Sequence, residues 1–140
     1  MKIGLVGCGG RGTGAAAQAL RSDRNVQLTA MGDVFKSQLD GSLAALQKDI
    51  DPAKIKVDPD HQFVGLDAYK KVIDSGVDVV LLTSPPGFRP VHFKYAVEAG
   101  KHIFTEKPMA SDAVGVQSIM ASVEEAKKKN LAVVAGFCWR

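Results

Sequence analysis

Cysteine and aromatic residues are scarce in this sequence. Two cysteines and 6% aromatic residues occur among its 140 positions. Cys8 and Cys138 are too few for a fold stapled by disulfides, and their wide separation does not match the spacing of metal ligands. We therefore expect two free, buried thiols and no metal site.

Long apolar runs and a dominant charge of one sign are also missing. No apolar run reaches the roughly 18 residues that a membrane helix requires, and the N-terminus enters a strand pattern without a signal-peptide pattern. The net charge is +3. Lys127–Lys129 fall at the C-terminal end of a predicted helix, where cations interact favourably with the negative end of the helix dipole. No basic patch is interleaved with aromatic residues. We expect a cytoplasmic protein with no membrane or nucleic-acid partner.

The sequence does contain the patterning of one α/β domain. Apolar residues make up 46% and charged residues 24% of the chain, as in ordinary globular domains, and we expect residues 1–140 to form a single domain. Strands are predicted at 3–6, 26–32, 77–83, 101–105 and 131–136, with a short third strand at Ile55 and Val57. Helices are predicted at 11–22, 36–48, from Tyr69 to a stop at Gly76, at 90–99 and after Ser111. This order predicts a doubly wound, mostly parallel sheet, the Rossmann fold, with ligands beyond the carboxyl ends of its strands.

The last predicted helix has a candidate cap and an apolar face. Ser111 can accept a backbone hydrogen bond as its N-cap. Five residues at helical spacing are predicted to share the face that packs on the sheet, namely Val116, Ile119, Met120, Val123 and Ala126. Gly100 is predicted to end the preceding helix in the left-handed conformation.

The most specific motif is the glycine-rich turn GCGGRG at 7–12, which joins the first predicted strand to a predicted helix. In a G-x-G-x-x-G motif, Gly7 permits the tight turn, Gly9 lets a pyrophosphate approach the backbone, and Gly12 allows close helix packing. The N-terminus of the helix offers unpaired N–H groups to an anion. The motif predicts a dinucleotide site, and the alternative is a glycine-rich turn without a ligand.

Asp33 ends the second predicted strand, about 20 residues beyond the loop, where an acidic residue can bind both hydroxyls of the adenosine ribose. Its carboxylate would repel a 2′-phosphate, which favours NAD over NADP, although Lys36 stands nearby. The alternative is an aspartate that caps the next helix.

Glu106-Lys107-Pro108 follows another predicted buried strand, and Pro108 removes a backbone donor and fixes the turn. Partial burial and a neighbouring cationic nicotinamide ring would disfavour the charged form of Lys107 and suit it to acid-base chemistry. Glu106 is expected to hold Lys107 or to contact the cofactor. The alternative is an ordinary surface ion pair.

Residues that follow the strands are predicted to converge on one crevice, because parallel strands end at the same edge of a sheet. Thr83–Pro86 and the residues from Gly136 onward therefore join the motifs above as candidates. His61, His92 and His102 are weaker candidates, since such histidines are more often structural or exposed.

Several of these segments together resemble one known family. GLVGCGGRG, Asp33, TSPP, EAGKHIFTEKP and the terminal GFCWR are similar to the Gfo/Idh/MocA family of glucose-fructose oxidoreductase, inositol dehydrogenase and rhizopine catabolism. The resemblance covers essentially the whole chain. It implies an NAD(P)-dependent oxidoreductase that acts on sugars, cyclitols or related polyols, with hydride passing to nicotinamide C4.

The resemblance also implies a role for each candidate residue. Lys107 matches the family's catalytic lysine, which positions the reacting hydroxyl and takes part in its proton transfer. The other residues would contact the cofactor, with Gly7, Gly9, Gly10, Arg11 and Gly12 at the pyrophosphate, Asp33 at the adenosine ribose, Thr83, Ser84 and Pro85 along its length, and Glu106 near the nicotinamide ribose.

The sequence departs from the family pattern in two places. Phe88 and Arg89 lengthen the turn before His92, so the match of His92 to the family's histidine is insecure. Family members also continue past the position of Arg140 into a second α/β domain that binds the sugar or polyol and forms the oligomer. We therefore expect an N-terminal cofactor domain of a homo-oligomeric parent, able to bind NAD and essentially inactive alone.

Two classes of function stay open at this point. One is the cofactor half of a sugar or polyol dehydrogenase. The other is a non-catalytic NAD-binding sensor or regulatory module, because one fold can host many functions.

Overall fold

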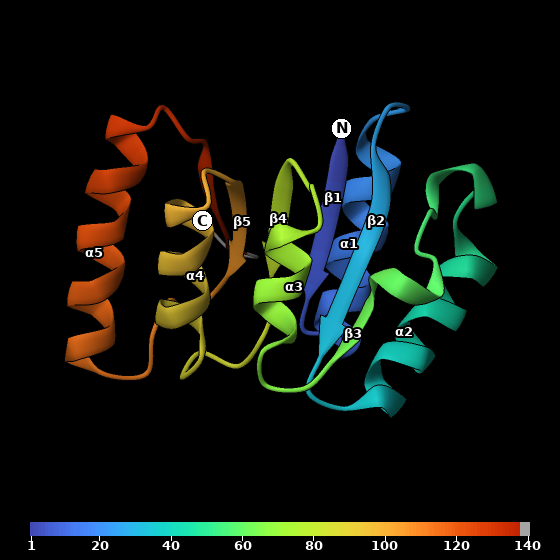
Figure 1. The fold of residues 1–140 in the computed structure, drawn as a ribbon, viewed down its shortest axis with the longest axis horizontal. Coiled ribbons are helices and arrows are strands. Elements are labelled where there is room, and N and C mark those ends of the chain that lie inside the picture. Colours follow the sequence, from blue (N-terminus) through green and yellow to red (C-terminus); the bar gives the residue numbers. More distant parts are fainter. Residues whose placement is uncertain (138–140) are drawn as a thin grey trace.

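The sheet of the computed structural model, which describes residues 1–137, is entirely parallel among the described strands. Its order is β3-β2-β1-β4-β5-β6. The strand bounds are β1 Lys2–Val6, β2 Gln27–Asp33, β3 Gln62–Val64, β4 Val79–Leu82, β5 His102–Glu106 and β6 Val133–Gly136. The chain builds outward from β1 to β3 and then crosses back to β4 (Figure 1). A doubly wound sheet opens a crevice at such a reversal, here between the ends of β1 and β4.

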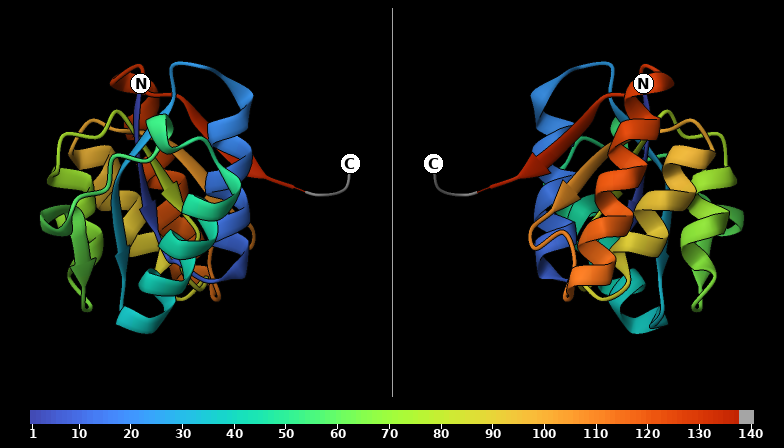
Figure 2. Two further views of the ribbon diagram at one scale, coloured as in Figure 1. Left: turned by 90° about the vertical axis from the view of Figure 1, so that its right-hand side faces the viewer. Right: turned by 90° about the vertical axis from the view of Figure 1, so that its left-hand side faces the viewer.

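Helices cover both faces of the sheet (Figure 1 and Figure 2). One face carries α1 (Gly10–Ser22) and α2 (Lys36–Asp49), and the other carries α3 (Ala68–Asp74), α4 (Arg89–Glu98) and α5 (Ala113–Lys128). The predicted doubly wound Rossmann fold is confirmed. Gly100 has φ +70°, as predicted for a residue that ends a helix in the left-handed conformation.

Side-chain alternation along the central strand divides the core into two clusters. Ile3 and Leu5 of β1 pack with the helices α1 and α2. Val6 points to the opposite face and packs with α3 and α4. Gly4 shares that opposite face, where a Cβ would lie 2.6 Å from Cγ1 of Val72. Because helices bury both faces, the strand is an unbroken apolar run, which is the pattern typical of parallel sheets.

The third strand does not lie where the sequence predicts it. The prediction at Ile55 and Val57 is wrong, since Ile55 forms an isolated bridge with Leu28 and the paired strand is β3, farther along the chain. Short 3₁₀ turns at Pro52–Lys54 and Pro59–His61, with caps at Asp51 and Asp58, enclose this segment. The turns leave too little extended chain between them for a ladder of hydrogen bonds.

The start of α5 differs from the prediction by one residue. Asp112, not Ser111, is the N-cap, and its carboxylate accepts a hydrogen bond from the N–H of Gly115 at 2.7 Å. A carboxylate at this position accepts a hydrogen bond from an otherwise unpaired backbone N–H group. Its negative charge also interacts favourably with the positive end of the helix dipole.

The buried stripe of α5 is narrower than predicted. Ile119 and Ala126 are buried, and Val123 packs against the core in a partly buried position. Val116 and Met120 are 45% and 64% exposed. α5 is the outermost helix of its layer, beside α4 (Figure 1), so a smaller part of its circumference is covered.

The corrected N-cap gives a stability prediction. Asp112→Ala leaves the N–H of Gly115 without its side-chain acceptor, so we expect the free energy of unfolding to fall by about 1 kcal/mol. Urea unfolding monitored by circular dichroism measures the change. Ser111→Ala is the matched control and is expected to cost less than about 0.5 kcal/mol. A larger loss of unfolding free energy in Ser111→Ala than in Asp112→Ala would show that Ser111 is the N-cap.

Candidate functional site

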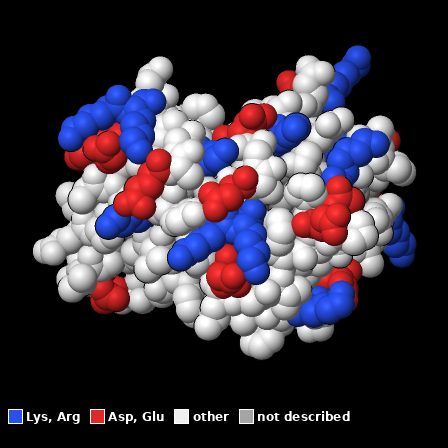
Figure 3. All heavy atoms as spheres, viewed as in Figure 1, with Lys and Arg blue, Asp and Glu red and all other residues white. Residues whose placement is uncertain are grey.

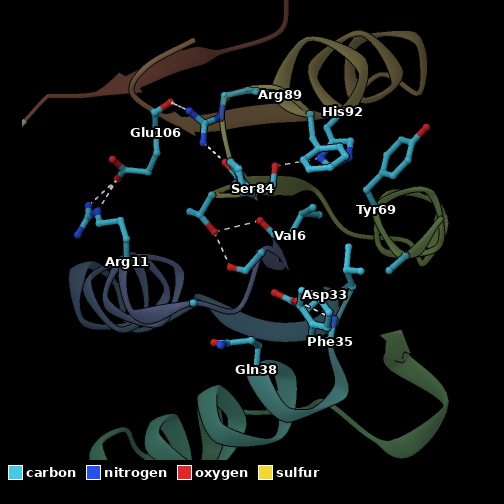
Figure 4. A pocket seen from close by; sticks show the side chains of 18 of the residues that line it. Val6, Arg11, Asp33, Phe35, Gln38, Tyr69, Ser84, Arg89, His92 and Glu106 are labelled. Carbon is cyan, nitrogen blue, oxygen red and sulfur yellow. Dashed lines mark hydrogen bonds and ion pairs between the residues drawn. The ribbon is translucent and has the colours of Figure 1, made fainter. Parts of the chain in front are cut away.

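The carboxyl ends of β1, β2, β4 and β5 surround a cleft of about 650 Å³, seen from close by in Figure 4. Most of the residues singled out from the sequence line it, namely Gly7, Gly9, Arg11, Asp33, Thr83, Ser84, Pro85, Glu106 and Lys107. Gly10 and Gly12 do not line the cleft. The structure thus brings segments from four parts of the chain to one edge of the sheet, while their roles toward a ligand stay predictions.

Close backbone contact explains two of the glycines. Gly7 has φ +94°, and a Cβ on it would lie 2.6 Å from the backbone nitrogen of Ser84. A Cβ on Gly12 would lie 2.0 Å from the carbonyl oxygen of Gly7. The Thr83 hydroxyl donates to that same carbonyl at 2.6 Å. Any side chain at either glycine would push β4 or α1 away from the turn.

The other two glycines face open space. A Cβ on Gly9 or on Gly10 would meet nothing within 4 Å. Gly9 precedes α1 without a side-chain cap, and the first turn of the helix carries no acidic residue. The N-terminus of α1 is therefore open to an anion and has the unpaired N–H groups that an anion binds.

Asp33 is fixed by two backbone donors at the end of β2. One carboxylate oxygen accepts from the N–H of Cys8 at 2.6 Å, and the other accepts from the N–H of Phe35 at 2.9 Å. The second bond closes a turn before α2, whose N-cap is Phe35 without a side-chain cap, so the alternative in which Asp33 caps that helix is wrong. The first bond ties the end of β2 to the glycine loop, and the side chain still lines the cleft.

Cys8 is a buried free thiol, as expected. Burial, together with the charge of Asp33, raises the pKa of Cys8 to about 12. The group is therefore a protonated thiol near neutral pH and not a nucleophile. Cys138 lies outside the described residues.

A stacked aromatic group forms one wall of the cleft. The His92 ring lies on the Tyr69 ring with centroids 4.1 Å apart, and His92 Nδ1 shares a hydrogen bond with the Ser84 hydroxyl at 3.0 Å. Burial, together with the positive charge of Arg89, lowers the pKa of His92 to about 4. His92 is thus a neutral, structurally satisfied histidine at physiological pH.

The other two histidines lie elsewhere. His61 pairs with Asp58, and His102 accepts a hydrogen bond from the N–H of Ala132. Neither lines the cleft.

Glu106 is buried and pairs with a residue other than the one expected. Its carboxylate is 2.6 Å from a guanidinium nitrogen of Arg11, and Nε of Arg11 donates to it at 2.8 Å. The side chain of Glu106 is 5% exposed and that of Arg11 is 46% exposed. The ion pair links the first turn of α1 to the end of β5. In the residues described, it takes the place of the predicted contact between Glu106 and Lys107.

Lys107 lines the cleft but is exposed, so its predicted partial burial is wrong. It follows β5 directly, where the chain leaves the sheet and turns through the cis peptide bond to Pro108. Its exposed side chain lies at the rim of the cleft. The amino group can therefore reach a ligand in the cleft from its open side.

Arg89 is a cleft residue that sequence reasoning noticed only as part of a lengthened turn. It is the first residue of α4 and is 2% exposed. Its guanidinium donates to the backbone carbonyls of Ser84, Glu106 and Pro108. Burial lowers the pKa of Arg89, and the nearby Glu106 carboxylate opposes that shift. No sequence signal separates such a buried arginine from an exposed one.

Exposed apolar side chains at the β2 and β3 side of the cleft were also missed. Phe35 is 67% exposed and Leu66 is 69% exposed, and both line the cleft with Val34. They follow β2 and β3 in irregular segments where hydrophobic periodicity gives no signal. Exposed apolar groups beside a cleft suit a flat, weakly polar ligand group.

The described residues contain no comparable feature for a metal ion or a membrane. Within residues 1–137, no group of three or more His, Cys, Asp or Glu is placed to hold a metal ion. None of the described helices has the length and apolarity to cross a membrane. On the face seen in Figure 3, acidic and basic side chains are interspersed and do not gather by sign.

The depressed pKa of His92 predicts a pH dependence of stability. The unfolded chain takes up a proton at His92 near its ordinary pKa of about 6.5, whereas the folded chain does so only near 4. Because the unfolded chain then binds more protons, the stability due to neutral His92 is present above pH 6.5 and is lost as the pH falls toward 4. The full loss is about 3 kcal/mol.

Urea unfolding at about pH 7 and about pH 5 measures the first part of this loss, about 2 kcal/mol. His92→Phe keeps a ring on Tyr69 but cannot titrate, so the difference between the two proteins isolates His92 from the carboxylates. An equal loss in both proteins would contradict the prediction.

Comparisons with known proteins identify the family of this chain. Residues 1–137 match the Gfo/Idh/MocA family, described as an oxidoreductase family with an NAD-binding Rossmann fold. Inositol 2-dehydrogenase of Cereibacter sphaeroides is 31% identical over 140 residues, which is 100% of this chain and 37% of that protein. A 1-carboxy-3-chloro-3,4-dihydroxycyclohexa-1,5-diene dehydrogenase of Comamonas testosteroni is 34% identical over 110 residues, covering 79% of this chain and 24% of that protein.

Solved structures show the same fold. Scyllo-inositol dehydrogenase from Lactobacillus casei, with bound NAD(H) and scyllo-inositol, matches with a TM-score of 0.74 and 25% identity over 97% of this chain and 36% of its own. Biliverdin reductase from Synechocystis, at 18% identity and a TM-score of 0.71, shares the fold alone. This chain spans little more than a third of the inositol dehydrogenases that it matches. The chain belongs to the Gfo/Idh/MocA family of oxidoreductases, a family described by its NAD-binding Rossmann fold.

Proposed function

We propose that this chain is the cofactor-binding part of an NAD-dependent dehydrogenase that oxidises a hydroxyl of a sugar, cyclitol or related polyol. The observation that supports this most directly is one cleft that holds an open helix N-terminus, a fixed carboxylate and an exposed lysine, each from a different strand end. The curated relatives named above are dehydrogenases of inositol and of a dihydroxylated ring. Both names point to a ring hydroxyl as the group that reacts.

The shape of the cleft fits a dinucleotide. The pyrophosphate would lie over Gly9 and Gly10, where no side chain stands in the way. Arg11, partly exposed at the same helix turn, would add positive charge beside it. The exposed apolar residues Phe35 and Leu66 would border the adenine at the β2 side. The nicotinamide end would then extend along Ser84 toward Lys107.

Asp33 supports a preference for NAD over NADP. Its carboxylate is held by two backbone N–H groups at the end of β2, so it cannot turn away from the cleft without losing both bonds. Fixed in that place, it would accept hydrogen bonds from the two ribose hydroxyls and repel a 2′-phosphate.

Lys107 would act on the substrate hydroxyl. When bound, NAD supplies the acceptor for the hydride that leaves the substrate carbon. The amino group of Lys107 would hold the hydroxyl oxygen in position and take part in removing its proton. Its exposed position at the rim lets it approach a substrate that enters from the open side of the cleft.

Substrate selection would rest with a segment outside these residues. The matched relatives are almost three times as long as this chain, and the described part of the cleft offers few polar groups for a polyol beside Lys107. We therefore propose that the chain alone binds NAD and turns over almost nothing, and that the complete protein is a homo-oligomer.

The cofactor assignment can be tested on this chain alone. We expect NADH to bind at least about tenfold more tightly than NADPH, which corresponds to about 1.4 kcal/mol. Asp33→Ala removes the repulsion and is expected to bring the two dissociation constants within about threefold of each other. Titration of the cofactor fluorescence measures both constants.

Asp49→Ala is the matched control for the Asp33 variant, since Asp49 is an exposed carboxylate that pairs with Arg21 away from the cleft. It should leave the preference for NADH unchanged. Absence of NADH binding by the unsubstituted chain at about 1 mM cofactor would reject the nucleotide site itself.

The role of Lys107 requires the full-length protein. Lys107→Ala is expected to lower kcat for oxidation of inositol or a related polyol by about 10²-fold or more, because it removes the group that handles the proton. NADH binding should change by less than about threefold, since Lys107 lies beyond the phosphate and adenosine ends of the proposed cofactor path.

Lys128→Ala, at an exposed position that pairs with Glu125, is the matched control for Lys107. Unchanged hydride transfer in the Lys107 variant would remove the catalytic assignment. NADH binding without turnover of any polyol by the full-length protein would favour the sensor or regulatory module instead.

A further inference from the structure

Arg89 is a cation in the interior of the domain. It is 2% exposed, whereas arginines are seldom fully buried unless they are paired. Its position at the start of α4 places it beneath the loops that follow β4 and β5. Burying a charge costs free energy unless hydrogen bonds compensate it. The hydrogen-bond partners of Arg89 therefore indicate its role in the structure.

The partners of Arg89 are backbone carbonyls from two different loops. One guanidinium nitrogen donates to the carbonyls of Glu106 and Pro108, and the other donates to the carbonyl of Ser84. Figure 4 shows the bonds to Glu106 and Ser84. Nε is buried without a hydrogen-bond partner in the described structure. Since both terminal nitrogens bind carbonyls and the side chain is enclosed, Arg89 acts through the backbone and not on a ligand in the cleft.

Two of these carbonyls flank Lys107. Glu106 precedes it and Pro108 follows it, so one nitrogen of Arg89 donates hydrogen bonds to the backbone on both sides of the lysine. No hydrogen bond or ion pair of the Lys107 side chain occurs among the described residues, and that side chain is exposed. The backbone is therefore what directs Lys107 toward the cleft.

We propose that Arg89 is a positioning residue that fixes Lys107 at the rim of the cleft by binding the backbone on both sides of it. The third carbonyl, that of Ser84, sets the distance from this lysine to the loop after β4. The role in turnover rests on the proposed function, whereas the hold on the backbone does not. A planar guanidinium offers donors in a fixed fork, and a lysine ammonium cannot reproduce that geometry.

The first test uses NMR relaxation on the 140-residue chain. In Arg89→Gln we expect the backbone order parameters of Lys107 and Met109 to fall from about 0.85 to below about 0.6, while Ile103 in β5 keeps its value. Arg89→Lys, which keeps the charge, should give an intermediate fall and serves as the readout if the glutamine variant does not fold. Arg21→Gln, at an exposed position on α1, is the matched control.

The second test uses the full-length protein with inositol and NAD. Arg89→Lys is expected to lower kcat by about 10- to 100-fold, because a misplacement of about 1 Å at a reacting group has an effect of this size. The dissociation constant of NADH should change by less than about threefold. In a Lys107→Ala background the same substitution should have little further effect on kcat, since a positioning residue has nothing left to position.

Two results would overturn the proposal. One is an unchanged order parameter at Lys107 in the folded Arg89 variants. The other is an equal loss of kcat from Arg89→Lys in the presence and absence of Lys107, which would indicate a general structural role. If the unsubstituted full-length protein oxidises no polyol, the proposed function fails, and the NMR comparison still decides the hold of Arg89 on Lys107.

Discussion

The close approach of three backbone segments at the end of β1 is the constraint on which the rest of the structure depends. Gly7 lies against the backbone of Ser84, and Gly12 lies against the carbonyl of Gly7. With no Cβ at either position, α1 can begin immediately beside the strand and β4 can pair with β1 up to its last residue. The N-terminus of the helix then opens onto the point where the direction of sheet building reverses, and the cleft forms there.

Two carboxylates secure the glycine loop from opposite sides. Asp33 binds the N–H of Cys8 from the end of β2, and Glu106 binds Arg11 from the end of β5. Arg89 holds the backbone of Glu106 in turn. The loops after four strands are thus joined by polar contacts and not by chain connectivity. Such contacts fix the spacing between the ends of a cofactor site before any ligand is bound, which lowers the ordering cost of binding.

The sequence predicts most of the fold because the apolar runs and helical periodicities are long and both faces of the sheet are covered. It fails for β3, a strand of three residues whose position depends on the turns before it. It also fails for the exposure of Lys107, because residue order shows that a side chain follows a strand but not how far it stands beyond the edge. Arg89 was missed because its burial depends on carbonyls from residues 84, 106 and 108, which only the folded chain brings together.

The exposure of Lys107 has a consequence for the chemistry. Hydride transfer benefits from a site that excludes water, because fixed dipoles then act at full strength and side reactions are suppressed. This cleft is open on the side where Lys107 stands, and the described residues provide no cover for it. Under the proposed function, this domain would hold the cofactor and position the lysine, and a covering segment would exclude water and supply the polar groups that recognise a polyol. The hydrogen bonds of Arg89 to the backbone around Lys107 are then important, because they would fix the position of the lysine before the covering segment closes over the cleft.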